Sequence, residues 1–165
     1  MADSSAEDQL ASFLAKFTPE VAALAKSIRA AMRKRYPFAL ELVYDNYNAL
    51  AIGYSPTERP SEGIFSIAVF PQWVSLFFLQ AGGLSDPDKI LKGSGNVAKH
   101  VRLPSAKSLS EPAVAALMAE ATHKAKVPFD PDNKHRPIIR SVSAKQRPRR
   151  PAEPADKPKK KKPKQ

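Results

Sequence analysis

Hydrophobic residues recur at helical spacing in two successive segments at the start of the chain. Residues 4–17 carry apolar side chains three or four positions apart, a spacing typical of an amphipathic helix: Leu10, Phe13, Leu14 and Phe17. Ser4 and Glu7 have the spacing of a capping box at its start. A second helix is predicted from Thr18, a favoured N-cap residue, to the residue before Pro37, which ends it.

The middle of the chain changes to the period of a β-sheet. Residues 39–56 indicate two short strands on either side of the turn pair Asp45-Asn46. Residues 63–71 and 73–80 are rich in aromatic and β-branched side chains and predict two strong strands. Their link at Pro71-Gln72 is short, so we expect them to pair antiparallel.

The last third returns from strand to helix. Four elements are expected there: a helical turn over 85–93 that ends at Gly93 or Gly95 in the left-handed conformation, a strand over 99–104, a helix over 111–126, and an edge strand or arm over 138–142. Helices at both ends of a strand-rich centre predict an α+β fold. We expect a mainly antiparallel sheet of four to six strands, with N-terminal and C-terminal helices packed on it.

Composition narrows the chemistry. The chain of 165 residues contains no cysteine, which excludes disulfides, thiolate metal sites and cysteine nucleophiles. Its start is acidic and polar, and no apolar stretch approaches the length of a membrane span. We therefore expect a soluble cytoplasmic protein that does not associate with membranes.

The net charge of +11 is concentrated at the C-terminus. Residues 140–165 hold eleven Lys or Arg and two Asp or Glu, a charge of +9, together with five prolines. Such a composition disfavours a packed core and predicts a disordered tail that attracts phosphate backbones through counterion release. A merely solubilising tail and a nuclear-import address are the alternatives. The candidate polyanion-binding residues are Lys145, Arg147, Arg149, Arg150, Lys157, Lys159, Lys160, Lys161, Lys162 and Lys164.

Aromatic residues are denser in the strand region than one buried sheet face requires. One interpretation is a sheet buried on both faces, one covered by the helices and the other by the N-terminal helix or by a second subunit in a homodimer through the aromatic face. The other is an apolar cleft that holds a small ligand. The residues expected to rim this cleft are Tyr47, Asn48, Trp73, His100 and Arg102.

Residues that would signal catalysis or cofactor binding do not form a known motif. Gly93 and Gly95 lack the spacing of a phosphate-binding loop, and Ala98 stands where a dinucleotide fingerprint needs its third glycine. The three histidines have no metal-ligand spacing, and no nucleophile elbow occurs. No catalytic residue, metal site or cofactor is predicted, and a binding protein is favoured over an enzyme.

Three stretches resemble the YdhG-like domains, also described as domain-of-unknown-function family 1801. They are "FTPEVAALAKSIRAAMRKRYP", the run from "GIFSIAVFP" to "RLPSAKSL", and within it "LSDPDKILKGSGNVAKHVRL". The resemblance covers about residues 17 to 125. It implies a YdhG-like α+β domain over 18–139, preceded by an N-terminal helix over 1–17 and followed by the tail over 140–165.

This family includes a frataxin-like iron chaperone, so the resemblance also implies an iron carrier as an alternative function. Iron delivery requires clustered carboxylates, whereas the corresponding helix has Glu20 followed by Lys26, Arg29, Arg33 and Lys34. The leading prediction is therefore an accessory protein whose basic tail contacts nucleic acid or another polyanion non-specifically. A small-ligand or iron carrier acting through the folded domain is the alternative.

Overall fold

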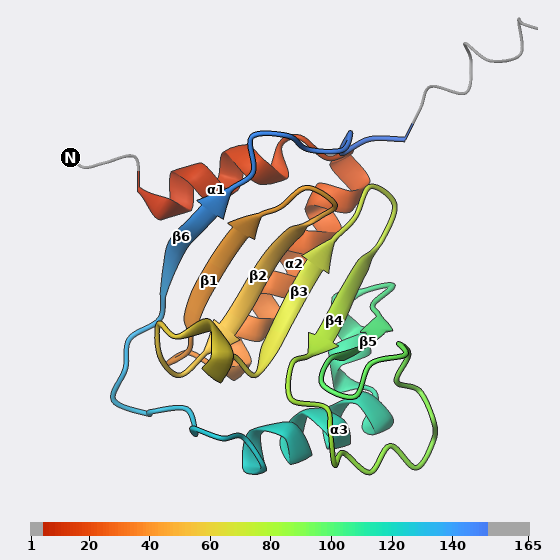
Figure 1. Cartoon of the computed structure of the whole chain (residues 1–165). Helices are drawn as coiled ribbons and strands as arrows, with labels where there is room; N and C mark the ends of the chain where they lie inside the picture. Colours follow the sequence, from red (N-terminus) through yellow and green to blue (C-terminus); the bar gives the residue numbers. More distant parts are fainter. Residues whose placement is uncertain (1–4, 152–165) are drawn as a thin grey trace, which may run out of the picture.

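A computed structural model describes residues 5–151 of the chain (Figure 1). The helices and strands are α1 (Ala6–Leu14), α2 (Pro19–Arg35), β1 (Leu40–Asp45), β2 (Leu50–Ser55), β3 (Phe65–Val69), β4 (Val74–Phe78), β5 (Lys99–Arg102), α3 (Pro112–His123) and β6 (Arg136–Val142), with short 3-10 turns η1 (Pro60–Glu62) and η2 (Ala106–Ser110). The strands form one sheet in the order β5-β4-β3-β2-β1-β6. Neighbouring strands from β1 to β5 are antiparallel, and β6 pairs parallel to β1. The predicted α+β class is confirmed.

The two N-terminal helices begin at residues whose side chains cap them. Thr18 Oγ1 accepts a hydrogen bond from the Val21 amide at 3.3 Å, as its position predicts. At the start of α1 the cap is Ser5, whose Oγ accepts from the Asp8 amide at 3.1 Å. The predicted cap Ser4 lies outside the described residues.

The helical turn predicted over 85–93 does not form. The two carboxylate oxygens of Asp86 accept hydrogen bonds from the Ile90 and Leu91 amides at 2.9 and 3.2 Å. Because this side chain replaces the backbone carbonyls of a helix, the segment is an irregular loop, and Asp86 and Lys89 have positive φ angles of 41° and 55°. Gly93 has a positive φ of 116°, as expected of one of the two glycines, but it ends no helix, and the irregular segment continues to Lys99, where β5 begins.

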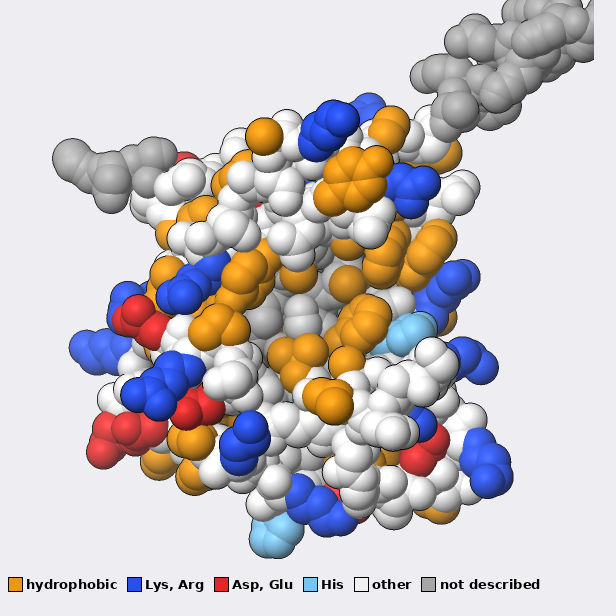
Figure 2. Space-filling view, in the orientation of Figure 1, with side chains coloured by type: hydrophobic (Ala, Val, Ile, Leu, Met, Phe, Trp, Pro, Cys, Tyr) orange, Lys and Arg blue, Asp and Glu red, His pale blue; other side chains and the backbone are white. Residues whose placement is uncertain are grey.

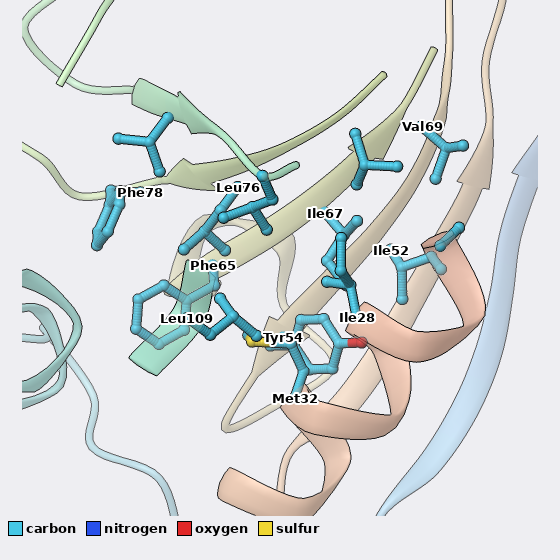
Figure 3. Close-up of a cluster of buried hydrophobic side chains, with 14 of the residues drawn as sticks. Ile28, Met32, Ile52, Tyr54, Phe65, Ile67, Val69, Leu76, Phe78 and Leu109 are labelled. Carbon is cyan, nitrogen blue, oxygen red and sulfur yellow. The ribbon is translucent and has the colours of Figure 1, made fainter. Parts of the chain in front are cut away.

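The hydrophobic core lies between the helices and one face of the sheet. Alternate strand residues point toward α2, where they surround Ile28 and Met32 (Figure 3). Those labelled in the figure are Ile52, Tyr54, Phe65, Ile67, Val69, Leu76 and Phe78, all buried. Helix α1 belongs to this core rather than to a separate unit, since Leu10 and Leu14 are buried in it. The other face of the sheet turns away from α2 (Figure 1).

The folded domain extends beyond residue 140, so the predicted start of the disordered tail is wrong. Strand β6 continues to Val142, and the Arg149 side chain further along is 3 % exposed. The physical reason is Asp45, a fully buried carboxylate at the end of β1 that requires positively charged partners. Residues 152–165, which hold the rest of the predicted tail, lie outside the described residues. No helix of the described range is long and apolar enough to cross a membrane.

Candidate binding face

Small side chains occupy the centre of the sheet face that turns away from α2. Register pairs Ala51 with Ala68 and Ala68 with Ser75, while Gly53 pairs with Ser66. These five residues therefore share one face of the sheet, and three of them, Ala51, Ser66 and Ala68, form the floor of a groove. The floor is recessed, since the exposed fractions of Ser66 and Ala68 are 8 % and 6 %.

Larger side chains stand on both sides of this floor and make it a groove. One wall is the turn between β1 and β2, with Asn46, Tyr47 and Asn48; the other is apolar, with Phe70, Phe77 and Leu79. The groove has a volume of about 630 Å³. Figure 2 shows it as a hollow with orange, apolar side chains around it. No Asp or Glu belongs to the described residues that line it.

Two aromatic stacks lie beside the groove, one at the turn between β3 and β4 and the other across β4 and β5. The rings of Phe70 and Trp73 lie 4.9 Å apart between centroids, and those of Phe77 and His100 lie 4.8 Å apart. The guanidinium carbon of Arg102 is 4.5 Å from the Trp73 ring centroid. Antiparallel register produces this arrangement, because His100 pairs with Phe77 and Arg102 pairs with Ser75. The stacks thus form a row of π surfaces that ends in a cation.

The five residues predicted to rim a cleft are distributed over both sides of this groove. Tyr47 and Asn48 line it directly. The other three lie behind the opposite wall. Trp73 stacks on Phe70, His100 stacks on Phe77, and Arg102 lies against Trp73.

Sequence reasoning missed the apolar wall of Phe70, Phe77 and Leu79, the floor of the groove, and Ser143, which also lines it. The signal for the floor is present in the sequence. Ala51 and Gly53 alternate with large residues along β2, and Ser66 and Ala68 do so along β3. Because successive side chains of a strand point to opposite faces, small residues at every second position form a recessed surface on the face away from the core.

The C-terminal segment of residues 143–150 is fixed to the groove wall by a buried ionic cluster. Arg149 Nη2 lies 2.8 Å from Asp45 Oδ1, and Lys16 Nζ lies 2.7 Å from Oδ2. Burial alone would raise the pKa of Asp45, but the hydrogen bonds from Lys16 and Arg149 hold it below its usual value. Arg149 also stacks over Phe17 at 5.6 Å. Its inclusion among the polyanion-binding residues is therefore a mistaken prediction, since its charge is engaged inside the fold.

Backbone hydrogen bonds continue this attachment along the segment. The Ser143 amide donates to the Asp45 carbonyl at 2.9 Å, and the Arg147 amide donates to the Tyr47 carbonyl at 2.9 Å. The side chains of Lys145, Arg147 and Arg150 remain exposed beside the groove wall. The other predicted polyanion-binding residues, all lysines, lie outside the described residues: Lys157, Lys159, Lys160, Lys161, Lys162 and Lys164.

A second buried carboxylate, Glu41, lies on the same side of the sheet as Asp45, facing the helices, because the two pair with the core residues Tyr54 and Leu50. Arg29 Nη2 lies 2.7 Å from Glu41 Oε1, His135 Nε2 lies 2.6 Å from the same oxygen, and the Tyr54 hydroxyl donates to Oε2 at 2.7 Å. Burial would raise the pKa of Glu41, but the hydrogen bonds from His135 and Arg29 lower it to about 2. Arg29 also pairs with Glu7 at 2.9 Å.

This network joins α1, α2, β1, β2 and the segment before β6. Its carboxylate is fully buried and surrounded by donors, so it holds the fold together instead of facing a ligand. Within residues 5–151, no group of three or more His, Asp or Glu side chains is arranged to hold a metal ion.

No protein-family model, curated protein or solved structure matches this chain. The resemblance to the YdhG-like domains therefore stays an expectation carried by the quoted motifs.

Proposed function

We propose that the protein is a non-enzymatic accessory protein that binds nucleic acid, with its C-terminal cations contacting the phosphate backbone. The observation that carries the proposal is the charge distribution: residues 140–165 contribute +9 of the net +11. Within the described part of this region, Arg149 is engaged by Asp45, while Arg140, Lys145, Arg147 and Arg150 are exposed.

The physical basis is release of the counterions that surround a phosphate backbone. A protein that neutralises several phosphates releases the same number of cations into solution, and binding weakens as salt is added. Lysine is a point charge that contacts phosphate without reading base edges. The Lys-rich end of the chain therefore supports binding without sequence preference.

A small-ligand carrier is the second candidate, and the groove on the open face favours it. Its volume of about 630 Å³ lies in the usual range of ligand pockets. The iron-carrier alternative has no comparable support, since the described residues contain no cluster suited to a metal ion.

Fluorescence anisotropy of a labelled DNA duplex, measured at several salt concentrations, tests the proposal on the full chain. If about six cations engage the duplex, the log–log salt slope should be roughly −5. A test variant changes six lysines to glutamine: Lys157, Lys159, Lys160, Lys161, Lys162 and Lys164. A control variant removes the same charge from exposed positions elsewhere: Lys26, Arg33, Lys34, Lys92, Lys107 and Lys126.

The C-terminal variant should lose most of its affinity and its salt slope, while the control variant keeps both. Equal losses in the two variants would show that only net charge matters. Failure of the full chain to bind the duplex at low salt would refute the proposed function itself.

A further inference from the structure

We propose that the open face of the sheet is a base-stacking site for single-stranded nucleic acid. This inference rests on the proposed function and adds a second, chemically different contact to it. The cations hold the phosphates, and the aromatic row on β4 and β5 holds the bases.

The aromatic side chains of this face are positioned for stacking and are not part of the core. Trp73, Ser75 and Phe77 alternate along the chain with the buried residues Val74, Leu76 and Phe78, so the first three face away from α2. Phe70, Trp73, Phe77 and His100 are half-buried, and Tyr47 across the groove is 50 % exposed. A nucleobase has a π face that stacks on such rings whatever its sequence.

The floor of the groove allows a flat ring to lie close to the sheet. Ala51 and Ala68 project little beyond the backbone, and Ser66 lies on the same face beside them. A groove of about 630 Å³ between aromatic walls therefore accommodates planar groups. Bases in a duplex are covered by their stacked neighbours, so this surface selects unpaired strands.

Charge complementarity identifies an anionic partner. Arg102 lies against Trp73, at the end of the aromatic row, where its guanidinium can contact a phosphate next to a stacked base. Lys145 and Arg147 lie on the other side, in the segment that reaches the groove through Ser143. None of the described residues that line the groove is acidic, so no side chain of this lining repels a negatively charged ligand.

The face carries its own spectroscopic probe, because Trp73 is the only tryptophan of the chain. The full chain is titrated at fixed salt with a deoxythymidine 15-mer and with a 15-base-pair duplex, following both tryptophan emission and anisotropy. Saturable quenching by the single strand, little quenching by the duplex, and at least tenfold tighter binding of the single strand are expected.

Two matched variants locate the contact. Phe77→Leu keeps an apolar side chain but removes the ring, and should weaken single-strand binding about tenfold while changing duplex binding less than twofold. Phe129→Leu is the control, since Phe129 stacks on Tyr36 beside α2 and not on the open face. It should change neither affinity by more than twofold. Arg102→Gln, at an exposed position, should weaken single-strand binding without any effect on folding.

The outcomes separate this inference from the proposed function. Failure to bind either nucleic acid defeats both. Equal binding of the two forms, with unchanged tryptophan emission and no effect of Phe77→Leu, overturns the stacking site and leaves the cationic contact standing. A tightly held small molecule in the groove, or a dimer that Ala68→Arg abolishes in sedimentation, would also overturn it by assigning the face to another occupant.

Discussion

Arg149 and Asp45 form a buried ion pair between residues more than one hundred positions apart, with Nη2 and Oδ1 separated by 2.8 Å. The pair attaches the C-terminal segment to the β1–β2 turn, whose residues Asn46, Tyr47 and Asn48 form one wall of the groove. Residues 143–147, which include the exposed cations Lys145 and Arg147, therefore run along this wall of the groove.

Removing one partner of this pair should destabilise the domain. Arg149→Met leaves Asp45 buried with Lys16 as its remaining cationic partner, so we expect a loss of about 2–4 kcal/mol in the free energy of unfolding. Urea denaturation followed by circular dichroism measures it. Arg147→Met, at an exposed neighbour, is the control and should cost less than about 0.5 kcal/mol. Similar values for both variants would mean that the pair does not anchor the segment.

The Glu41 network should dominate acid unfolding. The pKa of the Glu41 carboxyl is about 2 in the folded protein and about 4.3 for an unfolded glutamate, so folding favours the ionised form. The resulting stability, on the order of 3 kcal/mol, is complete above the unfolded pKa and is lost as pH falls from there toward 2.

Urea midpoints between pH 6 and pH 2.5 measure this dependence. Glu41→Gln should be less stable at pH 6 and should show a flatter decline below pH 4.5. Glu58→Gln, which changes an exposed partner of Arg136, should leave the slope intact. A wild-type slope retained in the Glu41→Gln protein would contradict the assignment.

Gly93 and Gly95 should respond differently to alanine. Gly93 has φ 116°, a conformation that costs an L-residue about 1–2 kcal/mol or more, whereas a Cβ there would meet its neighbours only at 3.6 Å or beyond. Gly95 has no positive φ. Thermal unfolding should therefore show a lower midpoint for Gly93→Ala than for Gly95→Ala. Equal midpoints would show that the loop relaxes without strain.

Local signals in the sequence predicted most of the helices and strands. The Thr18 cap and the link at Pro71-Gln72 depend on neighbouring residues, and both helix α2 and the β3–β4 pair formed as expected. The prediction of a helical turn over 85–93 was wrong because the Asp86 carboxylate accepts the hydrogen bonds that helical carbonyls would accept. Such competition leaves almost the same sequence signature as a helix cap.

The C-terminal part of the fold was not predictable from its own composition. Proline and cations around Arg149 indicate disorder, whereas the contacts that fix this segment come from distant residues, the Asp45 carboxylate and the backbone of the β1–β2 turn. In the groove, the density of aromatic residues indicated an apolar cleft, and Tyr47 and Asn48 were predicted to rim it, but the wall residues Phe70 and Phe77 were not. The floor was not predicted, because small residues such as Ala and Ser form a surface only when the register of neighbouring strands places them side by side.

Photo-cross-linking tests whether a single strand binds on the open face of the sheet. A single-stranded oligonucleotide containing 5-iodouracil is irradiated with the full chain, and the modified residues are mapped by mass spectrometry. We expect cross-links at Trp73, Phe77 or Tyr47, which are lost when excess unlabelled single strand competes. Cross-links confined to α2 and α3, with none on the open face, would contradict it.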